Sequence, residues 1–291
     1  MRIVFFGTGA VSTAYLTTLL DGGFDVVAVV TKQPKRRTRN GSPEPTPVAQ
    51  IGMQAGLNVL TTLGDLGDLA FDLGVVVSYG RILPAALVDA HPLLNVHYSL
   101  LPAFRGAAPV ERSVLAGGLA SGVTLMRLVH EMDAGPVYAA QPVEIEGLGL
   151  SEAYARLTAA GCQLMGDWLV RRDSWLEEAA QPQVGLATYA PKITDGDLLI
   201  RSYESALQGY RRHLLGRAYF YAGPKRIRLV KAHIEEGETG SSLGTIVEGK
   251  IQMAKGLLVP ELVRPEGRST MSFADFLRGS AVERIGTRPE Q

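Results

Sequence analysis

The sequence predicts a two-domain α/β protein, in which a parallel-sheet domain is followed by a smaller β-rich domain. Residues 2–6 are an apolar run that ends at Gly7-Thr-Gly9, a helical pattern covers 11–20, and a second apolar run covers 26–30. This succession of strand, glycine turn, helix and strand is typical of the start of a parallel α/β sheet. After about residue 203, short strand-like runs alternate with glycine turns, which predicts a small β-barrel or sandwich.

The composition is that of a globular protein whose two parts differ slightly in charge. The 291 residues are 46% apolar and 20% charged, enough chain for two domains of ordinary size. The formal net charge is zero. Residues 1–202 carry 15 Lys and Arg against 19 Asp and Glu, a net −4, whereas residues 203–291 carry 14 against 10, a net +4. A basic second part can bind a polyanion locally although the whole chain is neutral.

A single cysteine and the lack of long apolar runs limit the class of protein. Cys162 alone cannot form an internal disulfide or a thiolate-rich zinc site, and no spacing of His, Asp and Glu suggests a metal. No apolar run has the length of a membrane span, and the chain begins with the strand-like residues 2–6 rather than a secretory leader. We therefore expect a cytoplasmic protein with no metal and no membrane partner.

The helical and strand periodicities are lost between about residues 179 and 202. We expect a first domain over residues 1–184, an interdomain linker over 185–202, and a C-terminal β-barrel domain over 203–291. The second domain is expected to begin with a helix over 203–221.

The Gly7-Thr-Gly9 turn has the start of a dinucleotide-binding motif. However, the third glycine position is Ser12, and Lys32 stands where an acidic residue would bind the ribose. A tight turn between strand and helix is the better interpretation.

Residues 31–47 combine four prolines, a glycine and five Lys and Arg residues, and we expect a long exposed loop without regular structure. Two interpretations stay open for its cations: they contact phosphate groups, or they are only a solvated surface. The cations concerned are Lys35, Arg36, Arg37 and Arg39.

The most promising chemistry lies in the strand-like run that carries Asn95 and His97. Side chains alternate along a strand, so an amide and an imidazole two residues apart point the same way. Asp133, in a glycine-bearing turn after another predicted strand, is the best-placed acid. Such a set without a nucleophile suits a reaction in which the substrate attacks, with donors stabilising an oxyanion and a base managing protons. From these residues alone a structural role stays open, because a single histidine in a strand is more often a core residue.

The amino-acid sequence of these segments resembles the signature of folate-dependent formyltransferases. The first part of that signature is Asn95-Val-His97, Ser99-Leu-Leu-Pro102 and Arg105-Gly-Ala-Ala-Pro109. Gly122-Val-Thr-Leu-Met126 and Asp133-Ala-Gly135 match its second part, and Tyr79-Gly-Arg-Ile-Leu-Pro84 matches its folate loop. The resemblance extends over nearly the whole chain and is most specific over residues 75–135.

The resemblance implies a Rossmann-like formyltransferase domain joined to a barrel of the oligonucleotide/oligosaccharide-binding type. It implies transfer of the formyl group of 10-formyltetrahydrofolate to the α-amino group of methionine carried by initiator tRNA, by a protein that we expect to be a monomer. Asn95 and protonated His97 would stabilise the oxyanion, and Asp133 would hold His97 and help to remove the amine proton. The folate site would be lined by Gly80, Arg81, Ile82, Leu83, Ser99, Leu100, Leu101 and Pro102. The tRNA would be bound by Lys35, Arg36, Arg37, Arg39 and the basic second domain.

Three departures from the family pattern concern the grip on tRNA rather than the chemistry. The basic loop, which usually reads Gly-Arg-Gly-Lys-Lys in the family, reads Thr38-Arg39-Asn-Gly-Ser42 here. After the Ser-Leu-Leu-Pro run, this chain has Ala103 where a basic residue is common. The start of the second domain, residues 217–224, also differs from the family pattern. An amino-sugar nucleotide formyltransferase and a non-catalytic folate- or RNA-binding protein are the alternatives. The basic loop and second domain favour tRNA over the sugar, and the joint presence of Asn95, His97 and Asp133 argues against a vestigial site.

Overall fold

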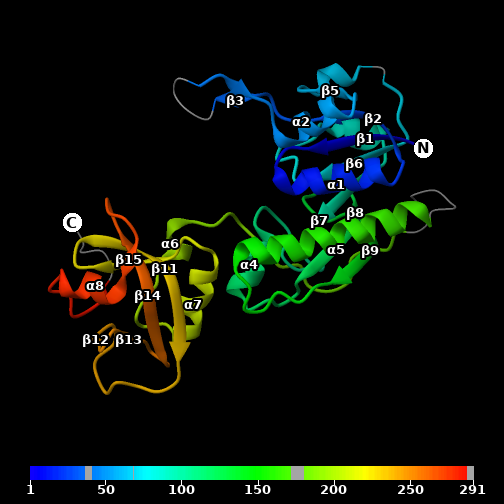
Figure 1. Cartoon of the computed structure of the whole chain (residues 1–291). Coiled ribbons are helices and arrows are strands. Elements are labelled where there is room, and N and C mark those ends of the chain that lie inside the picture. Colours follow the sequence, from blue (N-terminus) through cyan, green and yellow to red (C-terminus); the bar gives the residue numbers. More distant parts are fainter. Residues whose placement is uncertain (37–40, 68, 172–179, 287–291) are drawn as a thin grey trace. The chain divides into compact units, whose positions relative to one another are not determined.

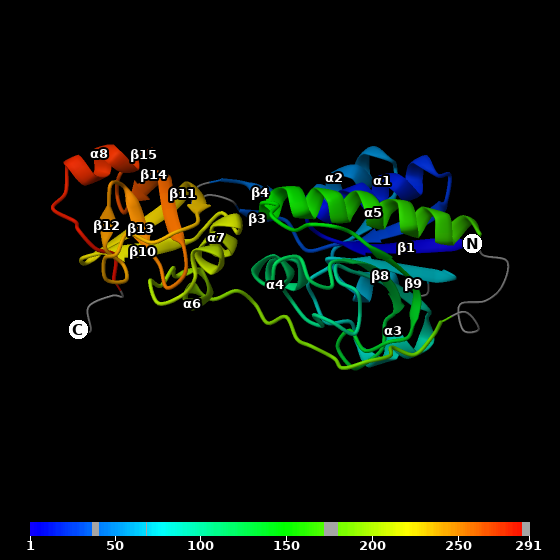
Figure 2. The ribbon, with the colours of Figure 1, turned by 90° about the horizontal axis from the view of Figure 1, so that it is seen from below.

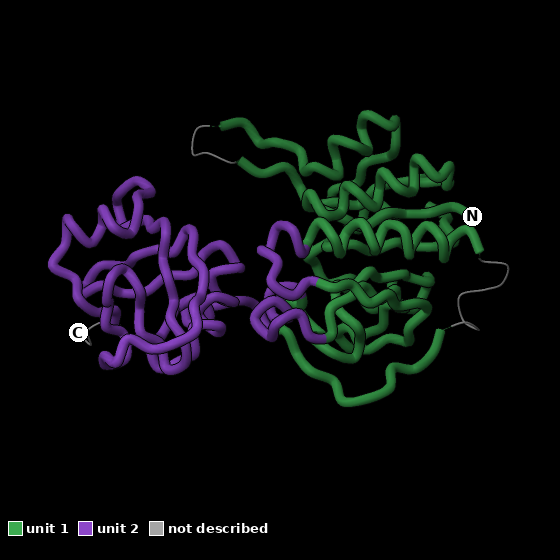
Figure 3. The backbone as a smooth tube through the Cα atoms, turned by 60° about the horizontal axis from the view of Figure 1, so that its bottom comes forward, with its two compact units in different colours: residues 1–109, 120–144, 154–190 green, residues 110–119, 145–153, 191–291 purple. Residues whose placement is uncertain are grey.

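The structure, a computed structural model, describes residues 1–36, 41–67, 69–171 and 180–286. These residues pack into two compact units, each with its own buried core, which are drawn in different colours in Figure 3. Unit 1 comprises residues 1–109, 120–144 and 154–190, and unit 2 comprises residues 110–119, 145–153 and 191–291.

A seven-stranded sheet forms the centre of unit 1, with the strand order β5-β2-β1-β6-β7-β8-β9 (Figure 1). Neighbouring strands from β5 to β7 run parallel, whereas β8 and β9 are antiparallel additions at one side. This mainly parallel sheet confirms the predicted Rossmann-like α/β class. The strands are β1 (Arg2–Gly7), β2 (Asp25–Val30), β5 (Asn58–Leu60), β6 (Leu73–Val77), β7 (Leu93–His97), β8 (Gly122–Arg127) and β9 (Val137–Pro142).

Helices cover both faces of this sheet, as its almost continuously apolar strands require. Val4 and Phe6 of β1 enter the same core as Val88 of α3, whereas Ile3 and Phe5 are buried on the other face. In Figure 2, α1, α2 and α5 lie on one side of the sheet and α3 lies on the other. No helix among the described residues has both the length and the apolarity to cross a membrane. The helices up to residue 170 are α1 (Ala10–Asp21), α2 (Pro47–Gln54), the 3-10 turn η1 (Gly64–Leu66), α3 (Ala85–Ala90), α4 (Pro109–Leu115) and α5 (Leu150–Val170).

The carboxyl ends of β1, β6 and β7 meet at one edge of the sheet. Gly7 lies opposite Val77 in the β1–β6 pair, and Val76 lies opposite Asn95 in the β6–β7 pair. Ser12, at the start of α1, closes the turn after β1 because its hydroxyl donates to the carbonyl of Val77 at 2.7 Å. A Cβ atom at Gly7 would lie 2.7 Å from the Cβ of Ser12, so close packing requires a glycine here. The Gly7 turn therefore has a structural explanation.

Residues 31–47 contain a short hairpin that the sequence did not predict. β3 (Lys35–Arg36) pairs with β4 (Pro43–Glu44) in an antiparallel ladder, and α2 then begins at Pro47. The expectation that this segment has no regular structure is wrong for these paired residues, because two-residue strands have no periodicity to detect. All the residues of β3 and β4 are exposed.

Unit 2 contains an antiparallel sheet that closes on itself. Its strand order is β10-β11-β14-β13-β12, with β15 paired to β14. Gly286 pairs with Tyr221 of the edge strand β10, and Arg284 pairs with Thr245 beside the opposite edge strand β12. Because residues 284–286 bridge both edges, the sheet is a closed barrel, and the predicted C-terminal β-barrel is confirmed. The strands are β10 (Tyr219–Ala222), β11 (Lys225–Glu235), β12 (Ile246–Val247), β13 (Lys250–Gln252), β14 (Leu257–Pro265) and β15 (Met271–Ser272), and the helices α6 (Asp195–Leu198), α7 (Ala206–Leu214) and α8 (Phe273–Arg278).

The helix expected over residues 203–221 is shorter in the structure. Ser205 caps the N-terminus of α7 by accepting from the backbone N–H of Gln208, and the helix ends before Gly216, which has a φ of 72°. The expectation is wrong beyond Leu214. Residues 219–222 form β10 instead, where Phe220 is fully buried in the barrel core.

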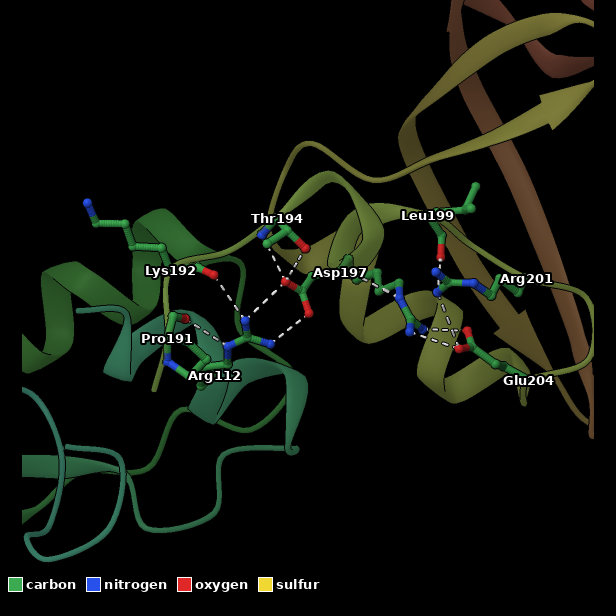
Figure 4. Close-up of polar contacts among 9 residues, drawn as sticks. Arg112, Pro191, Lys192, Thr194, Asp197, Leu199, Arg201 and Glu204 are labelled. Atoms are coloured by element: carbon green, nitrogen blue, oxygen red, sulfur yellow. Dashed lines mark hydrogen bonds and ion pairs between the residues drawn. The ribbon is translucent and has the colours of Figure 1, made fainter. Parts of the chain in front are cut away.

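Charged contacts fix the start of residues 191–291 within unit 2 (Figure 4). Arg112 of α4 donates to both carboxylate oxygens of Asp197 of α6, at 2.7 and 3.0 Å. The same guanidinium donates to the backbone carbonyls of residues 191 and 192. A second group of ion pairs joins Arg201 and Arg212 to Glu204. A segment that lacks periodicity is thus held by specific side chains.

Candidate active site

β7 places Asn95 and His97 on one face of the sheet, as the alternation of a strand predicts. Leu93, two residues before Asn95, enters the core that contains α3, so Leu93, Asn95 and His97 form one row on that face. Asn95 is half-buried, and His97 is 6% exposed. β8 lies alongside, with Met126 opposite Asn95 and Thr124 opposite His97.

The imidazole of His97 is held between a backbone carbonyl and a carboxylate. Its Nε2 lies 2.9 Å from the carbonyl oxygen of Phe104, which can only accept, so Nε2 is the atom that carries a proton in this bond. Nδ1 faces Oδ2 of Asp133 at 3.7 Å, which is an ion-pair distance rather than a hydrogen bond. The two side chains are 6% and 17% exposed. A proton on Nδ1 would therefore point toward a carboxylate that is partly shielded from water.

Asp133 lies in the turn between β8 and β9, with its backbone in the left-handed region at a φ of 51°. Its Oδ2 accepts a hydrogen bond from the backbone N–H of Gly106 at 2.7 Å. Gly106 itself has a φ of 119°, and a Cβ there would lie 3.0 Å from the carbonyl oxygen of Ala190. A glycine is therefore needed at the position that donates to Asp133.

Two loops leave the sheet at the edge beside these residues. Residues 80–83 follow β6 and residues 99–102 follow β7, and because the two strands are parallel neighbours both loops begin at the same edge. Thr124 of β8 holds the second loop: its hydroxyl donates to the carbonyl of Ser99 at 2.6 Å and accepts from the N–H of Leu101 at 3.2 Å. The carboxyl edge of the sheet therefore carries both the polar row and the two loops.

The side chains expected to line a folate site differ in exposure. Arg81 is exposed and Ile82 is 95% exposed, whereas Leu83 is buried in the core beside α3. The hydroxyl of Ser99 is buried and donates to the carbonyl of Ala103. Leu83 and Ser99 therefore use their side chains within the protein, and only their backbone groups can face a ligand.

Of the four expected phosphate-binding cations, Lys35 and Arg36 lie exposed on β3. Arg37 and Arg39 lie outside the described residues. Across the described part of the chain, no group of three or more His, Cys, Asp and Glu side chains is placed to hold a metal ion.

Sequence reasoning missed the residues that orient His97 and Asp133 through their backbones. Phe104 supplies the carbonyl that meets Nε2, with its own backbone in the left-handed region at a φ of 57°, and Gly106 supplies the N–H for Asp133. Of these two residues, only Gly106 could have been noticed in the sequence, because a glycine in a polar loop indicates a backbone conformation that other residues rarely adopt. The backbone carbonyl of a phenylalanine gives no such indication.

The arrangement can polarise a carbonyl group and manage a proton. Asn95 supplies an amide donor, and His97 an imidazole on the same face with a carboxylate close to one ring nitrogen. Ser99, the serine nearest to His97 in sequence, already donates to a backbone carbonyl, and the hydroxyl of Tyr98 is bonded to Thr158. This geometry suits stabilisation of an oxyanion during attack by a nucleophile that belongs to the substrate.

Comparison with known proteins gives full-length matches. The formyl transferase family matches residues 1–168, and the formyl transferase C-terminal domain matches residues 212–281. A methionyl-tRNA formyltransferase from Methylobacterium sp. (strain 4-46) is 35% identical over 310 aligned positions that cover 99% of this chain and 99% of the relative.

Solved structures with the same fold include enzymes with different acceptors in their names. An N-formyltransferase from Helicobacter canadensis, in complex with folinic acid and dTDP-3-aminofucose, has a TM-score of 0.69 and 14% identity, and the match covers 89% of this chain and 98% of that one. A methionyl-tRNA formyltransferase from Clostridium thermocellum has a TM-score of 0.60 and 12% identity, with 91% and 98% covered. These structures establish the fold. The full-length sequence match additionally relates the chain to the methionyl-tRNA formyltransferases within the family. The chain belongs to the formyl transferase family, together with methionyl-tRNA formyltransferases that match it from end to end.

Proposed function

We propose that this protein transfers the formyl group of 10-formyltetrahydrofolate to the α-amino group of methionine on initiator tRNA. The observation that carries the proposal is the approach of Asp133 to His97, at 3.7 Å, on the face of β7 that also carries Asn95. The choice of methionyl-tRNA as the acceptor of the formyl group rests on the 35% identity to a methionyl-tRNA formyltransferase over 99% of both chains.

The folate co-substrate supplies the formyl carbon and leaves as tetrahydrofolate with its nitrogen protonated. The amide of Asn95 donates to the oxygen of the formyl group as the amine forms its bond to the formyl carbon, and the positive charge of protonated His97 stabilises the oxyanion. Asp133 orients His97 and helps to remove the proton that the amine nitrogen loses. Collapse of the tetrahedral intermediate then breaks the bond to the folate nitrogen, and that nitrogen takes up the proton that the amine has lost. The protein's part in each step needs only these three side chains.

The residues at the sheet edge fit a folate. The exposed side chain of Ile82 offers an apolar surface for a flat ring, and the backbone groups of residues 80–83 and 99–102 can hydrogen-bond the edge of a pterin. For the tRNA, we propose contacts from Lys35 and Arg36 of β3, from Arg37 and Arg39, and from the barrel domain. We also propose the domain division 1–184, 185–202 and 203–291, a monomer, and a cytoplasmic location.

The test is a formylation assay with two acceptors side by side. Purified protein and 10-formyltetrahydrofolate are incubated with methionyl-initiator tRNA or with a dTDP-linked amino sugar, and formyl transfer is followed with a labelled formyl group. We expect transfer to the tRNA and none to the sugar. Transfer to the sugar alone would favour the alternative that shares this fold with the Helicobacter canadensis enzyme. No transfer to either acceptor would contradict the proposal.

A further inference from the structure

Gln183 lies in an irregular stretch of unit 1, yet its side chain makes four hydrogen bonds. Its Nε2 donates to the backbone carbonyls of Asp133 and Gly135, each at 2.8 Å. Its Oε1 accepts from Nε of Arg105 at 3.1 Å and from Nη2 of Arg105 at 2.8 Å. A primary amide has two N–H donors and two lone pairs on its oxygen, so this one uses its whole capacity.

These four bonds join the two segments that form the hydrogen bond between Gly106 and the Asp133 carboxylate. One segment is the turn of Asp133 itself, and the other contains Arg105, the residue before the Gly106 that donates to Oδ2 of Asp133. Gln183 therefore fixes the separation between the donor loop and the acceptor turn. That separation sets where Oδ2 lies relative to Nδ1 of His97.

The same stretch of chain also supports the second unusual backbone conformation beside His97. Phe104 and Asp133 are non-glycine residues with a left-handed backbone, a conformation that persists only when its surroundings hold it. Thr188 accepts from the N–H of Phe104 at 2.9 Å, and Gln183 donates to the carbonyl of Asp133. Both residues that flank the imidazole are thus tied to residues 183–188.

We propose that Gln183 is a positioning residue, which joins the Asp133 turn to the Arg105 loop and thereby holds the Asp133 carboxylate toward His97. Gln183 acts through Asp133 and does not contact the reacting atoms. The inference rests on the proposed function, because formyl transfer is its kinetic readout. A second readout, the imidazole resonances of His97 in the absence of substrate, is independent of that function.

Two replacements of Gln183 distinguish the role of its Nε2 donor from that of its Oε1 acceptor. Gln183→Met keeps the volume of the side chain and removes all four bonds. Gln183→Glu keeps an acceptor for Arg105 but places an oxygen against the carbonyls of Asp133 and Gly135. Gln181→Met is the matched control, because Gln181 is exposed and pairs with Val137 through its backbone.

We expect Gln183→Met and Gln183→Glu to lower kcat by roughly 10- to 100-fold while KM for folate and tRNA changes less than about two-fold. The control should behave like the native protein. In an Asp133→Asn background, Gln183→Met should lower the residual kcat by less than about two-fold more, because both changes act on one carboxylate. Thermal melting of each variant identifies losses that are due to unfolding.

Any one of three results would overturn the inference. The first is a kcat for Gln183→Met within about two-fold of the native value, and the second is that the effects of Gln183→Met and Asp133→Asn on kcat multiply. The third is that the His97 imidazole ¹H–¹⁵N resonances have the same positions in Gln183→Met as in Gln181→Met. If the native protein formylates no methionyl-tRNA while these resonances shift in Gln183→Met alone, the proposed function fails and the positioning role stands.

Discussion

Replacement of Asp197 by asparagine is expected to destabilise unit 2 at neutral pH and to have less effect in acid. Arg112, the largest cause, holds the pKa of the Asp197 carboxyl well below its usual range, and hydrogen bonds from Thr194 act in the same direction. Asparagine preserves the shape of the side chain and removes its charge. The network that it weakens is drawn in Figure 4.

The size of the effect follows from the geometry of the pair. Arg112 donates twice, at 2.7 and 3.0 Å, between side chains that are 20% and 23% exposed. A hydrogen bond to a charged group contributes about 1.5–3 kcal/mol. Asparagine can still accept one of the two bonds and the site is partly wet, so we expect a loss of about 1–3 kcal/mol at pH 7.

The sign of the pH dependence follows from the lowered pKa. A carboxyl whose pKa is lowered by folding contributes its full stabilisation above its unfolded pKa, near 4, and loses it as the pH falls toward the folded value. The difference between native and Asp197→Asn should therefore shrink below pH 4, by up to about 1.4 kcal/mol per pH unit.

Urea unfolding at pH 7, 5 and 3, followed by circular dichroism, measures this difference. Asp195→Asn is the matched control: Asp195 lies on the same short helix, but its side chain is 75% exposed and pairs with Arg226 at 3.5 Å. An exposed pair of this kind contributes about 0–1 kcal/mol. A native-minus-variant difference that is constant from pH 7 to pH 3, or that grows in acid, would refute the reasoning.

The remaining predictions concern the site, its acceptor and the turn beside it. His97→Ala should abolish formyl transfer while tetrahydrofolate binding stays measurable by calorimetry, and unchanged turnover would contradict a catalytic role. Joint replacement of Lys35 and Arg36 by alanine should raise KM for tRNA and reduce the salt slope of binding by up to about two, and unchanged tRNA kinetics would reduce these cations to a solvated surface. Gly135→Ala should lower thermal stability by about 1–3 kcal/mol, since its Cβ would lie 1.8 Å from the carbonyl oxygen of Arg127, whereas Gly9→Ala meets nothing within 4 Å and should not.

Local patterns in the sequence predicted the elements that present the site. β7 and its two polar residues follow from the period of two in a strand, and Asp133 from a turn between two apolar runs. The order β1-β6-β7, by contrast, brings the ends of strands far apart in sequence to one edge. We expected a site at that edge from the general rules for parallel sheets and from the family resemblance, not from the residues alone.

Features that depend on distant partners could not be predicted in this way. Gln183 lies between Pro182 and Gly185 in a stretch without periodicity, and nothing near it in the sequence indicates that its amide would contact Arg105 and Asp133. The helix expected through Tyr221 ends at Leu214 because β10 gains partners in β11 and buries Phe220. Long-range pairing overrode helical propensity there.

The closure of the barrel by residues 284–286 makes unit 2 sensitive to the order of synthesis. Until these residues leave the ribosome, Tyr221 of β10 and Thr245 beside β12 lack the partners that they have in the folded chain. Open strand edges are templates for pairing with a second chain. Unit 1, whose last residues are 180–190, is already made by then and can finish folding first. A ribosome that pauses before residue 284 would therefore display a folded first unit and an open, aggregation-prone sheet.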